Sequence, residues 1–279
     1  GFICSLEGKK TNDIISKALN ILTCLEHRGA VSSDGRTGDG AGILIEIPDI
    51  FFKKECKFNL PEFKEYAVGM VFLPPKKNQL NYCVDIFGEE IKRQGLNILG
   101  WRDVPVNSKV VGAIASQSQP NIKQVFVGKN DPNQTEKDFL LRLYIARKIS
   151  ENRIYQSKLS QRSFFYFSSL HNKTIIYKGL LIPEDIERFY IDLKNPMLVT
   201  RLALVHQRFS TNTFPTWDLA QPFRYMCHNG EINTLKGNIN RMISRQELMD
   251  SELIDKEDLE KIFPIILPGK SDSASMDMV

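Results

Sequence analysis

The sequence predicts an α+β fold, in which layers of helices and antiparallel strands pack on one another. Many short apolar segments of strand length accompany about five helical segments, and the two kinds occur in runs rather than in strict alternation. A further observation argues against a doubly wound nucleotide-binding sheet. The glycine-rich turn at 37–42 follows a helical pattern and precedes a strand pattern, the reverse of the order that a dinucleotide-binding motif needs.

The spacing of apolar residues predicts the elements of the first half. A helix is predicted over 13–26, with Asn12 or Asp13 able to cap its start. A strand at 42–47 follows and is ended by Pro48. Beyond it the predicted elements, in order, are a strand at 66–73, a helix at 78–94, strands at 98–106 and 125–127, and a helix at 136–149.

The second half begins with two short segments, 163–167 and 174–177, that are interpreted as a pair of strands. A short helix is predicted over 183–193, because Pro183 and the two acidic residues after it suit a first helical turn. The remaining predicted elements are a strand at 202–209, a helix at 238–249 and a strand at 262–267. No internal repeat or linker is visible, so one domain over 1–279 is expected.

Composition excludes several classes of protein. The 279 residues, 42% hydrophobic and 25% charged, are typical of a globular chain with a sizeable core. The net charge of +4 is small and the lysines are scattered, so nucleic acid is not expected as a partner. No apolar stretch reaches the roughly 18 residues that span a bilayer, and no secretory signal is visible, so no membrane partner is expected either. The five cysteines include no CxxC pair and favour a reducing cytoplasm.

Two motifs that suggest ligands have a simpler interpretation. The turn at 37–42 lacks the Lys-Ser/Thr pair of a phosphate loop, so we interpret it as a tight turn whose backbone closely approaches another segment. His27, His206 and His228, with Cys227, could in principle bind a metal. No two of them have ligand spacing on one helix, so no metal site is expected.

Polar residues concentrate between 205 and 240. A predicted strand ends in Gln207-Arg208 and passes into Ser, Thr and Asn, which places many donors at a sheet end, where sites commonly lie. Asn229-Gly230 offers a side-chain amide beside an unobstructed backbone N–H, the two donors that a developing oxyanion requires. The alternative for this pair is a plain Asn-Gly turn.

Taken together, these residues resemble the class II, N-terminal-nucleophile glutamine amidotransferase domain of the glutamate synthase large subunit. The matching stretches occur in order along nearly the whole chain, at 1–3, 25–30, 37–43, 101–106, 177–180, 205–217, 227–240 and 271–275. The stretches 101–106 and 207–217 resemble glutamate synthase in particular. The resemblance implies a four-layer αββα sandwich of the N-terminal-nucleophile hydrolase type.

The resemblance also implies roles for matching residues. Asn229, through its side-chain amide, and Gly230, through its backbone N–H, would form the oxyanion hole. Arg208 would clamp the α-carboxylate of L-glutamine, and Asp272 would receive its α-ammonium group. Asp272 lies near the last residue of the sequence, so it is not expected to be held firmly in place.

The resemblance implies three further residue roles, and the sequence departs from the family pattern in one respect. Phe209 and Thr211 would line the glutamine pocket, and Arg28 would support the nucleophile. Chains of the family begin with Cys-Gly-Val/Gly-Gly-Phe-Ile, so the nucleophilic cysteine is expected three positions before Gly1, with its own α-amine as base. Cys4 is not a substitute, because it falls within the first predicted strand and is expected to be buried. The sequence is therefore expected to be a fragment truncated at both ends and inactive by itself.

The implied activity is hydrolysis of L-glutamine to glutamate and ammonia through a cysteinyl thioester. The ammonia would pass to a synthase domain of the same chain that aminates 2-oxoglutarate. That full-length protein would carry FMN and an iron–sulfur cluster, neither of them in this fragment. It would receive electrons from a small reductase subunit or ferredoxin, in the cytoplasm or, in a photosynthetic source, a plastid. The alternatives are a class II amidotransferase acting on a sugar phosphate or phosphoribosyl diphosphate, and a non-catalytic glutamine-binding module without the nucleophile.

Overall fold

Two antiparallel sheets form the centre of the molecule. The computed structural model describes residues 1–208 and 213–279. Within these residues, eight strands form two four-stranded sheets, and every strand pairing is antiparallel. The first sheet consists, in spatial order, of β1 (Phe2–Cys4), β8 (Leu202–Gln207), β2 (Ala41–Glu46) and β7 (Thr174–Gly179). The second sheet consists of β4 (Leu96–Asp103), β5 (Asn121–Lys129), β3 (Tyr66–Leu73) and β6 (Tyr166–His171).

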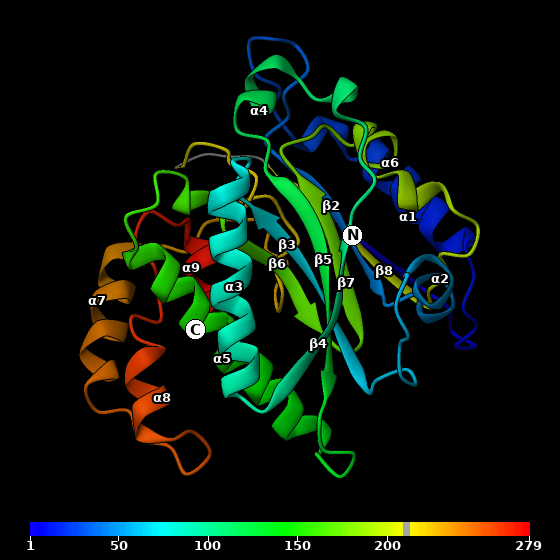
Figure 1. Cartoon of the computed structure of the whole chain (residues 1–279). Helices are drawn as coiled ribbons and strands as arrows, with labels where there is room; N and C mark the ends of the chain where they lie inside the picture. The colour runs from blue at the N-terminus through cyan, green and yellow to red at the C-terminus, as the bar shows by residue number, and fades with distance from the viewer. Residues whose placement is uncertain (209–212) are drawn as a thin grey trace.

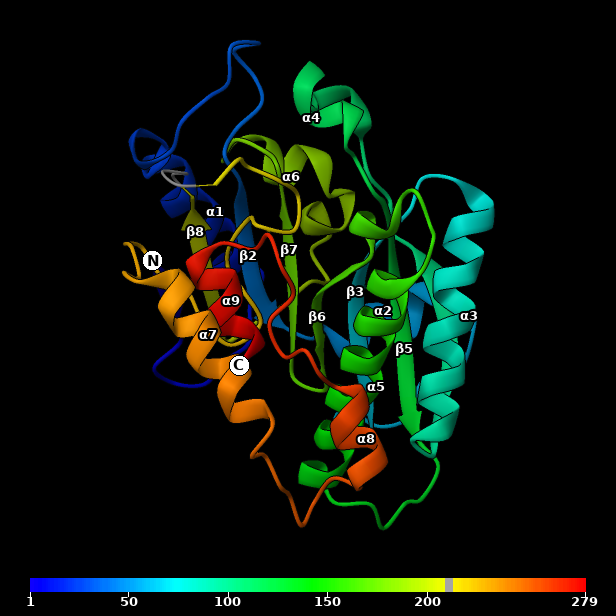
Figure 2. The ribbon, with the colours of Figure 1, turned by 90° about the vertical axis from the view of Figure 1, so that its left-hand side faces the viewer.

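Helices cover the outer faces of the two sheets. Figure 1 shows both sheets between α1, α2 and α6 on one side and α3 and α5 on the other. Figure 2 shows α7, α8 and α9 gathered near α5. The α-helices are α1 (Asp13–Cys24), α2 (Asp49–Glu55), α3 (Lys77–Arg93), α4 (Ala113–Gln117), α5 (Glu136–Gln156), α6 (Asp185–Phe189), α7 (Leu235–Gln246), α8 (Lys256–Lys261) and α9 (Asp272–Met278). The 3-10 turns are η1 (Glu26–Arg28), η2 (Ser108–Val110), η3 (Arg162–Phe164) and η4 (Ile191–Lys194).

The burial of the residues of strand β3 follows from the layers on its two faces. All eight of its residues are buried, because the second sheet is covered on both faces. Val68, Met70 and Phe72 contribute to the core between the sheets, whereas Ala67 and Val71 pack with α3 and α5. This alternation is the period of two that a strand imposes on its side chains. The strand predicted at 66–73 is confirmed, with the same bounds.

The predicted pairing of the segments at 163–167 and 174–177 is wrong. β6 pairs with β3 in the second sheet, whereas β7 pairs with β2 in the first, so the short turn between them carries the chain from one sheet to the other. Side chains join them instead. The buried Ser168 hydroxyl lies 3.3 Å from the carbonyl oxygens of Met70 and Ile176, and the amide of Ile176 donates to Ser169 Oγ.

The strand predicted at 262–267 is also wrong, because this segment consists of bends and turns. Pro264 has no backbone N–H to contribute to a ladder. Side chains satisfy the backbone of Ile265 instead: its amide donates to Gln246 Oε1 at 2.7 Å, and its carbonyl accepts from Lys148 Nζ at 2.7 Å. The apolar side chains of this segment pack against α5, α7 and α8.

Cys4 is exposed rather than buried as expected. The reason is its strand, because β1 is short and lies at the edge of the first sheet. In the part of the chain that the structure describes, no helix combines the length and the apolar character that crossing a membrane requires.

A buried group of charges joins α9 to α5 and β6. The Arg224 guanidinium pairs with Asp277 at 2.8 Å and lies 3.7 Å from Glu151, which in turn pairs with Arg147 at 2.9 Å. These four side chains are at most 5% exposed. Arg224 also donates to the carbonyl of Phe167 in β6 at 2.9 Å. Burial alone would raise the pKa of Glu151, but Arg147, Arg224 and Lys148 lower it overall.

Arg224→Met is expected to destabilise the fold strongly. The substitution leaves Asp277 and Glu151 buried with an unbalanced negative charge, a loss that typically costs about 3–5 kcal/mol. Lys17→Met is the matched control, because Lys17 pairs with Asp13 through side chains that are 61% and 63% exposed. Such a surface pair contributes about 1 kcal/mol or less. Urea unfolding of both variants measures the difference, and equal losses would contradict the importance of the buried group.

Candidate functional site

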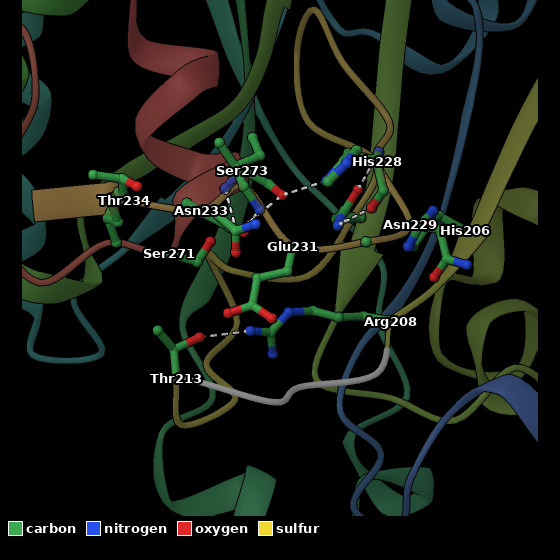
Figure 3. Close-up of a pocket in the computed structure, with 15 residues that line it drawn as sticks. His206, Arg208, Thr213, His228, Asn229, Glu231, Asn233, Thr234, Ser271 and Ser273 are labelled. Atoms are coloured by element: carbon green, nitrogen blue, oxygen red, sulfur yellow. Dashed lines mark hydrogen bonds between the residues drawn. The ribbon is translucent and has the colours of Figure 1, made fainter. Parts of the chain in front are cut away.

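A pocket of about 210 Å³ lies where three separate parts of the chain meet. The first is the end of β8, the second is the loop that leads into α7, and the third is the amino-terminal end of α9. Figure 3 shows the side chains that line it. They are His206, Arg208, Thr213, Gln221, His228, Asn229, Gly230, Glu231, Ile232, Asn233, Thr234, Leu235, Ser271, Asp272 and Ser273.

Arg208 is held at the end of β8 by its backbone and its side chain. Its amide donates to the carbonyl of Gly40 at 2.8 Å, which continues the contact between β8 and β2 by one residue. Its guanidinium donates to Thr213 Oγ1 at 2.8 Å and to the carbonyl of Asp39 at 3.4 Å. The residue is only 6% exposed, so the cation is oriented by the fold rather than by solvent.

Carboxylates surround this cation. Figure 3 shows Glu231 and Arg208 pointing toward one another across the pocket. Burial lowers the pKa of Arg208, and the charges of Asp39, Asp218 and Asp272 oppose that effect. A guanidinium nevertheless stays protonated at neutral pH. The pocket therefore contains one fixed positive charge with Glu231 and Asp272 in its walls, a distribution that suits a ligand with both signs of charge.

Asp272 is held in place, contrary to the expectation from its position near the last residue. Its Oδ2 accepts from the amide of Ile232 at 2.7 Å, and its Oδ1 accepts from the amide of Ser273 at 2.5 Å. Ser271 caps the helix that follows, because its hydroxyl accepts from the amide of Ala274 at 3.2 Å. The carboxylate thus fixes the loop opposite α9 while lining the pocket.

Asn229 and Gly230 are exposed in the loop before α7. On one side, the amide of Ile232 is bound by Asp272. On the other side, the backbone of His228 is bound by the side chain of Gln221, at 2.9 Å through its Nε2 and at 3.0 Å through its Oε1. Two anchors therefore flank the pair whose amide and N–H were predicted to act as donors.

The histidines and Cys227 come together only in part. His206 Nδ1 lies 3.2 Å from Cys227 Sγ, and His228 Nδ1 lies 3.4 Å from Ser273 Oγ, whereas His27 is exposed on η1. Among the residues that the structure describes, no group of three or more His, Cys, Asp or Glu side chains could hold a metal ion. Burial lowers the pKa of His206 to about 4, with further lowering from His228 and from Arg208.

The glycine-rich turn at 37–42 is a close-packed turn, as interpreted from the sequence. Gly40 has a φ of +127°, a conformation that side chains disfavour. A Cβ on Gly38 would lie 2.5 Å from the carbonyl oxygen of Leu181, and a Cβ on Gly42 would lie 2.6 Å from that of Gln221. The turn therefore lets the segment that ends at Gln221 press against the first sheet.

Three of the predicted site residues are not placed in the pocket. Phe209 and Thr211 lie outside the described residues. Arg28 is exposed at the end of η1 and does not line the pocket. Its neighbour Gly29 contacts β8, because a Cβ there would lie 1.9 Å from Gln207 Nε2.

The register of β1 directs the amino-terminal end of the chain toward the pocket. Gly1 and Val205 exchange hydrogen bonds of 2.8 Å in both directions, and Phe2 pairs with Leu204. Continued at the same register, the residue before Gly1 would oppose His206, and the third residue before Gly1 would oppose Arg208.

Sequence reasoning assigned no role to Gln221, Glu231, Thr213 or Ser273, all of which line the pocket. Glu231 directly follows Asn229-Gly230, and that adjacency was an available signal. Gln221 gave no such signal, because its partner is a backbone seven residues away across a loop.

Comparison with known proteins shows which family and which relatives the chain is similar to. A family model described as class-II glutamine amidotransferases matches residues 1–279. The chain is 48% identical to the glutamate synthase (NADPH) large chain of Bacillus subtilis, with 99% of this chain and 18% of that protein covered. It is 44% identical to the glutamate synthase (NADH) of Saccharomyces cerevisiae, covering 100% of this chain and 13% of that protein. It is 43% identical to the chloroplastic ferredoxin-dependent glutamate synthase 2 of Arabidopsis thaliana, covering 99% and 17%. The chain thus spans less than a fifth of the length of each of these three relatives.

The buried His206 is expected to make the protein less stable in mild acid. Its pKa of about 4 in the folded state lies below the ordinary value near 6.5, so the unfolded state takes up a proton first as the pH falls. This difference is worth about 1–2 kcal/mol between pH 7 and pH 5. Urea unfolding at both pH values should show a smaller decrease for His206→Gln than for the unsubstituted protein. Equal decreases would show that His206 does not have this depressed pKa.

Proposed function

The chain belongs to the class-II glutamine amidotransferases, and we propose that it is the glutaminase domain of a glutamate synthase. The domain comprises residues 1–279, and its two sheets with their outer helices form the four-layer αββα sandwich of N-terminal-nucleophile hydrolases. It hydrolyses L-glutamine to glutamate and ammonia. The identity of 40–48% to seven glutamate synthases over almost the whole chain favours this member of the family.

The observation that carries the proposal is the charge pattern of the pocket. Glutamine presents an α-carboxylate, an α-ammonium group and a side-chain amide. The buried guanidinium of Arg208 suits the carboxylate, because its planar fork can donate two parallel hydrogen bonds. Asp272 lines the same pocket and suits the ammonium group, and Glu231 adds a second negative charge there. Asn229 and Gly230 then face the side-chain carbonyl of the substrate.

The reaction needs a nucleophile beside these groups. We place a cysteine three residues before Gly1, opposite Arg208 in the continued register of β1 and β8. Its sulfur attacks the side-chain carbonyl carbon of glutamine, its α-amine takes the thiol proton, and that proton leaves with the nitrogen as ammonia. Water then hydrolyses the thioester to glutamate. The amide of Asn229 and the N–H of Gly230 stabilise the oxygen that becomes negative in each step.

The ammonia is used in another part of the longer protein. A synthase domain of the same polypeptide receives the ammonia and aminates 2-oxoglutarate, using FMN, an iron–sulfur cluster and electrons from a reductase subunit or ferredoxin. Iron–sulfur clusters are held mainly by several cysteine thiolates. The described part of this chain contains no group of three or more His, Cys, Asp or Glu side chains that could hold a metal, so its residues do not fit a cluster. A reducing compartment such as the cytoplasm suits the five free thiols.

Replacing Arg208 by lysine should raise the KM for glutamine about tenfold or more in the full-length enzyme. A single ammonium group cannot reproduce the two parallel hydrogen bonds, and losing one charge-assisted bond costs on the order of 1.5–3 kcal/mol. Arg188→Lys is the matched control, because Arg188 is 56% exposed on α6. Steady-state kinetics measures both variants. A change of less than twofold for Arg208→Lys would remove this residue from substrate binding.

An electrophilic glutamine analogue should label the full-length protein at the cysteine three positions before Gly1. Cys4 is not expected to be the nucleophile, because it lies within β1 opposite Leu202 and has no free α-amine. Mass spectrometry of the labelled peptide identifies the modified residue, and Cys4→Ser should label as fully as the unsubstituted protein. An adduct on Cys4 or on Cys227 would overturn the proposed nucleophile.

A further inference from the structure

The two proposed oxyanion donors, Asn229 and Gly230, are not held in place by hydrogen bonds of their own within the described residues. Both residues are exposed. Their positions therefore depend on the residues at either side of them. The Asp272 carboxylate binds the amide of Ile232 on one side, and the Gln221 side chain binds His228 on the other.

Gln221 binds both polar groups of one peptide backbone. Its Nε2 donates to the carbonyl of His228 at 2.9 Å, and its Oε1 accepts from the amide of His228 at 3.0 Å. These are the two bonds that a residue in a neighbouring antiparallel strand would form. A primary amide is suited to this arrangement, because it carries a donor and an acceptor side by side. Since His228 directly precedes Asn229, the pairing fixes the backbone from which the Asn229 side chain extends.

Gln221 is itself fixed to the first sheet. It is 6% exposed, and its carbonyl oxygen lies where a side chain at position 42 of β2 would begin, which only glycine allows. Two of the three carbonyls before it are also bound: Lys178 Nζ, buried in β7, donates to those of Asp218 at 3.0 Å and Ala220 at 2.6 Å. A rigid connection thus runs from the sheet through Gln221 to the loop.

We propose that Gln221 is a positioning residue that holds Asn229 and Gly230 in the geometry of the oxyanion hole. The inference rests on the proposed glutaminase function and adds a residue to it. Gln221 acts through His228, because both polar atoms of its side-chain amide are bound to the backbone of that residue. Its loss therefore reduces stabilisation of the transition state more than binding of glutamine.

Gln221→Glu tests the kinetic consequence in the full-length enzyme. The substitution keeps the size and the acceptor but removes the donor, and it places a carboxylate oxygen against the carbonyl of His228. We expect kcat for glutamine hydrolysis to fall at least tenfold while KM changes by less than about twofold, since losing one whole oxyanion donor costs roughly 100- to 1,000-fold in kcat. Asn229→Asp provides that larger reference value. Gln117→Glu, the same change at an exposed position on α4, is the control and should leave both constants unchanged.

A transition-state mimic separates positioning from general damage. L-Glutamate γ-semialdehyde forms a tetrahedral adduct with a thiol, so its inhibition constant should rise by the same factor by which kcat falls. The affinity for the product glutamate should stay unchanged. A rise in KM without a change in kcat, or an unchanged kcat, would overturn the proposal.

Amide hydrogen exchange tests the anchor without any need for activity. Gln221→Leu removes both bonds to His228, so exchange in the peptide 225–233 should accelerate while that of β2 and β7 stays constant. Thermal unfolding is recorded in parallel, and if Gln221→Leu does not fold, the Gln221→Glu variant is measured instead. Unchanged exchange at 225–233 would overturn the proposal. If the unsubstituted enzyme did not hydrolyse glutamine, the proposed function would fail, and the exchange measurement would still decide whether Gln221 holds the loop.

Discussion

Close packing of the segment 218–221 on the first sheet governs the geometry of the pocket. Only a glycine at position 42 lets the carbonyl of Gln221 approach β2, and Lys178 binds the carbonyls that precede it. Burial lowers the pKa of Lys178 to about 7, although Asp277 and Asp218 oppose this effect. The glycine-rich turn at 37–42, which leads into β2, also positions Arg208, because the amide of Arg208 donates to the carbonyl of Gly40. One glycine-rich turn thus sets both the cation of the pocket and the support of its loop.

Much of the fold could be predicted from the sequence, because burial leaves a pattern in the order of residues. The strand at 66–73 and the helix beginning at 136 were identified from such patterns. Pairing between strands leaves no such pattern. The segments now seen as β6 and β7 are neighbours in sequence, yet they belong to different sheets, because the better partners are β3 and β2. The apolar segment at 262–267 has strand-like composition, but the backbone of its residue Ile265 is satisfied by side chains of α5 and α7.

Residues of the candidate site could be predicted where neighbouring residues in the sequence carry suggestive chemistry. Asn229-Gly230 and Arg208 stand out in the sequence, and the structure brings them to one pocket with Asp272. Gln221 could not be found in this way, because an amide that binds a backbone across a loop has a partner only after folding. The stretch 101–106 shows the converse. It resembles glutamate synthase in particular, but within it the partly buried Arg102 pairs with the buried Asp192 at 2.8 Å, away from the pocket.

The place of α9 affects when the pocket can form during synthesis of the chain. Both sheets and α5 are complete once residue 207 has been made, whereas Asp272 and Asp277 are added later, with the α7 to α9 segment. A nascent chain lacking α9 would therefore contain the layered core but no ordered wall opposite Arg208. Because folding on the ribosome proceeds from the amino-terminal end, the pocket would be complete only after α9 has emerged.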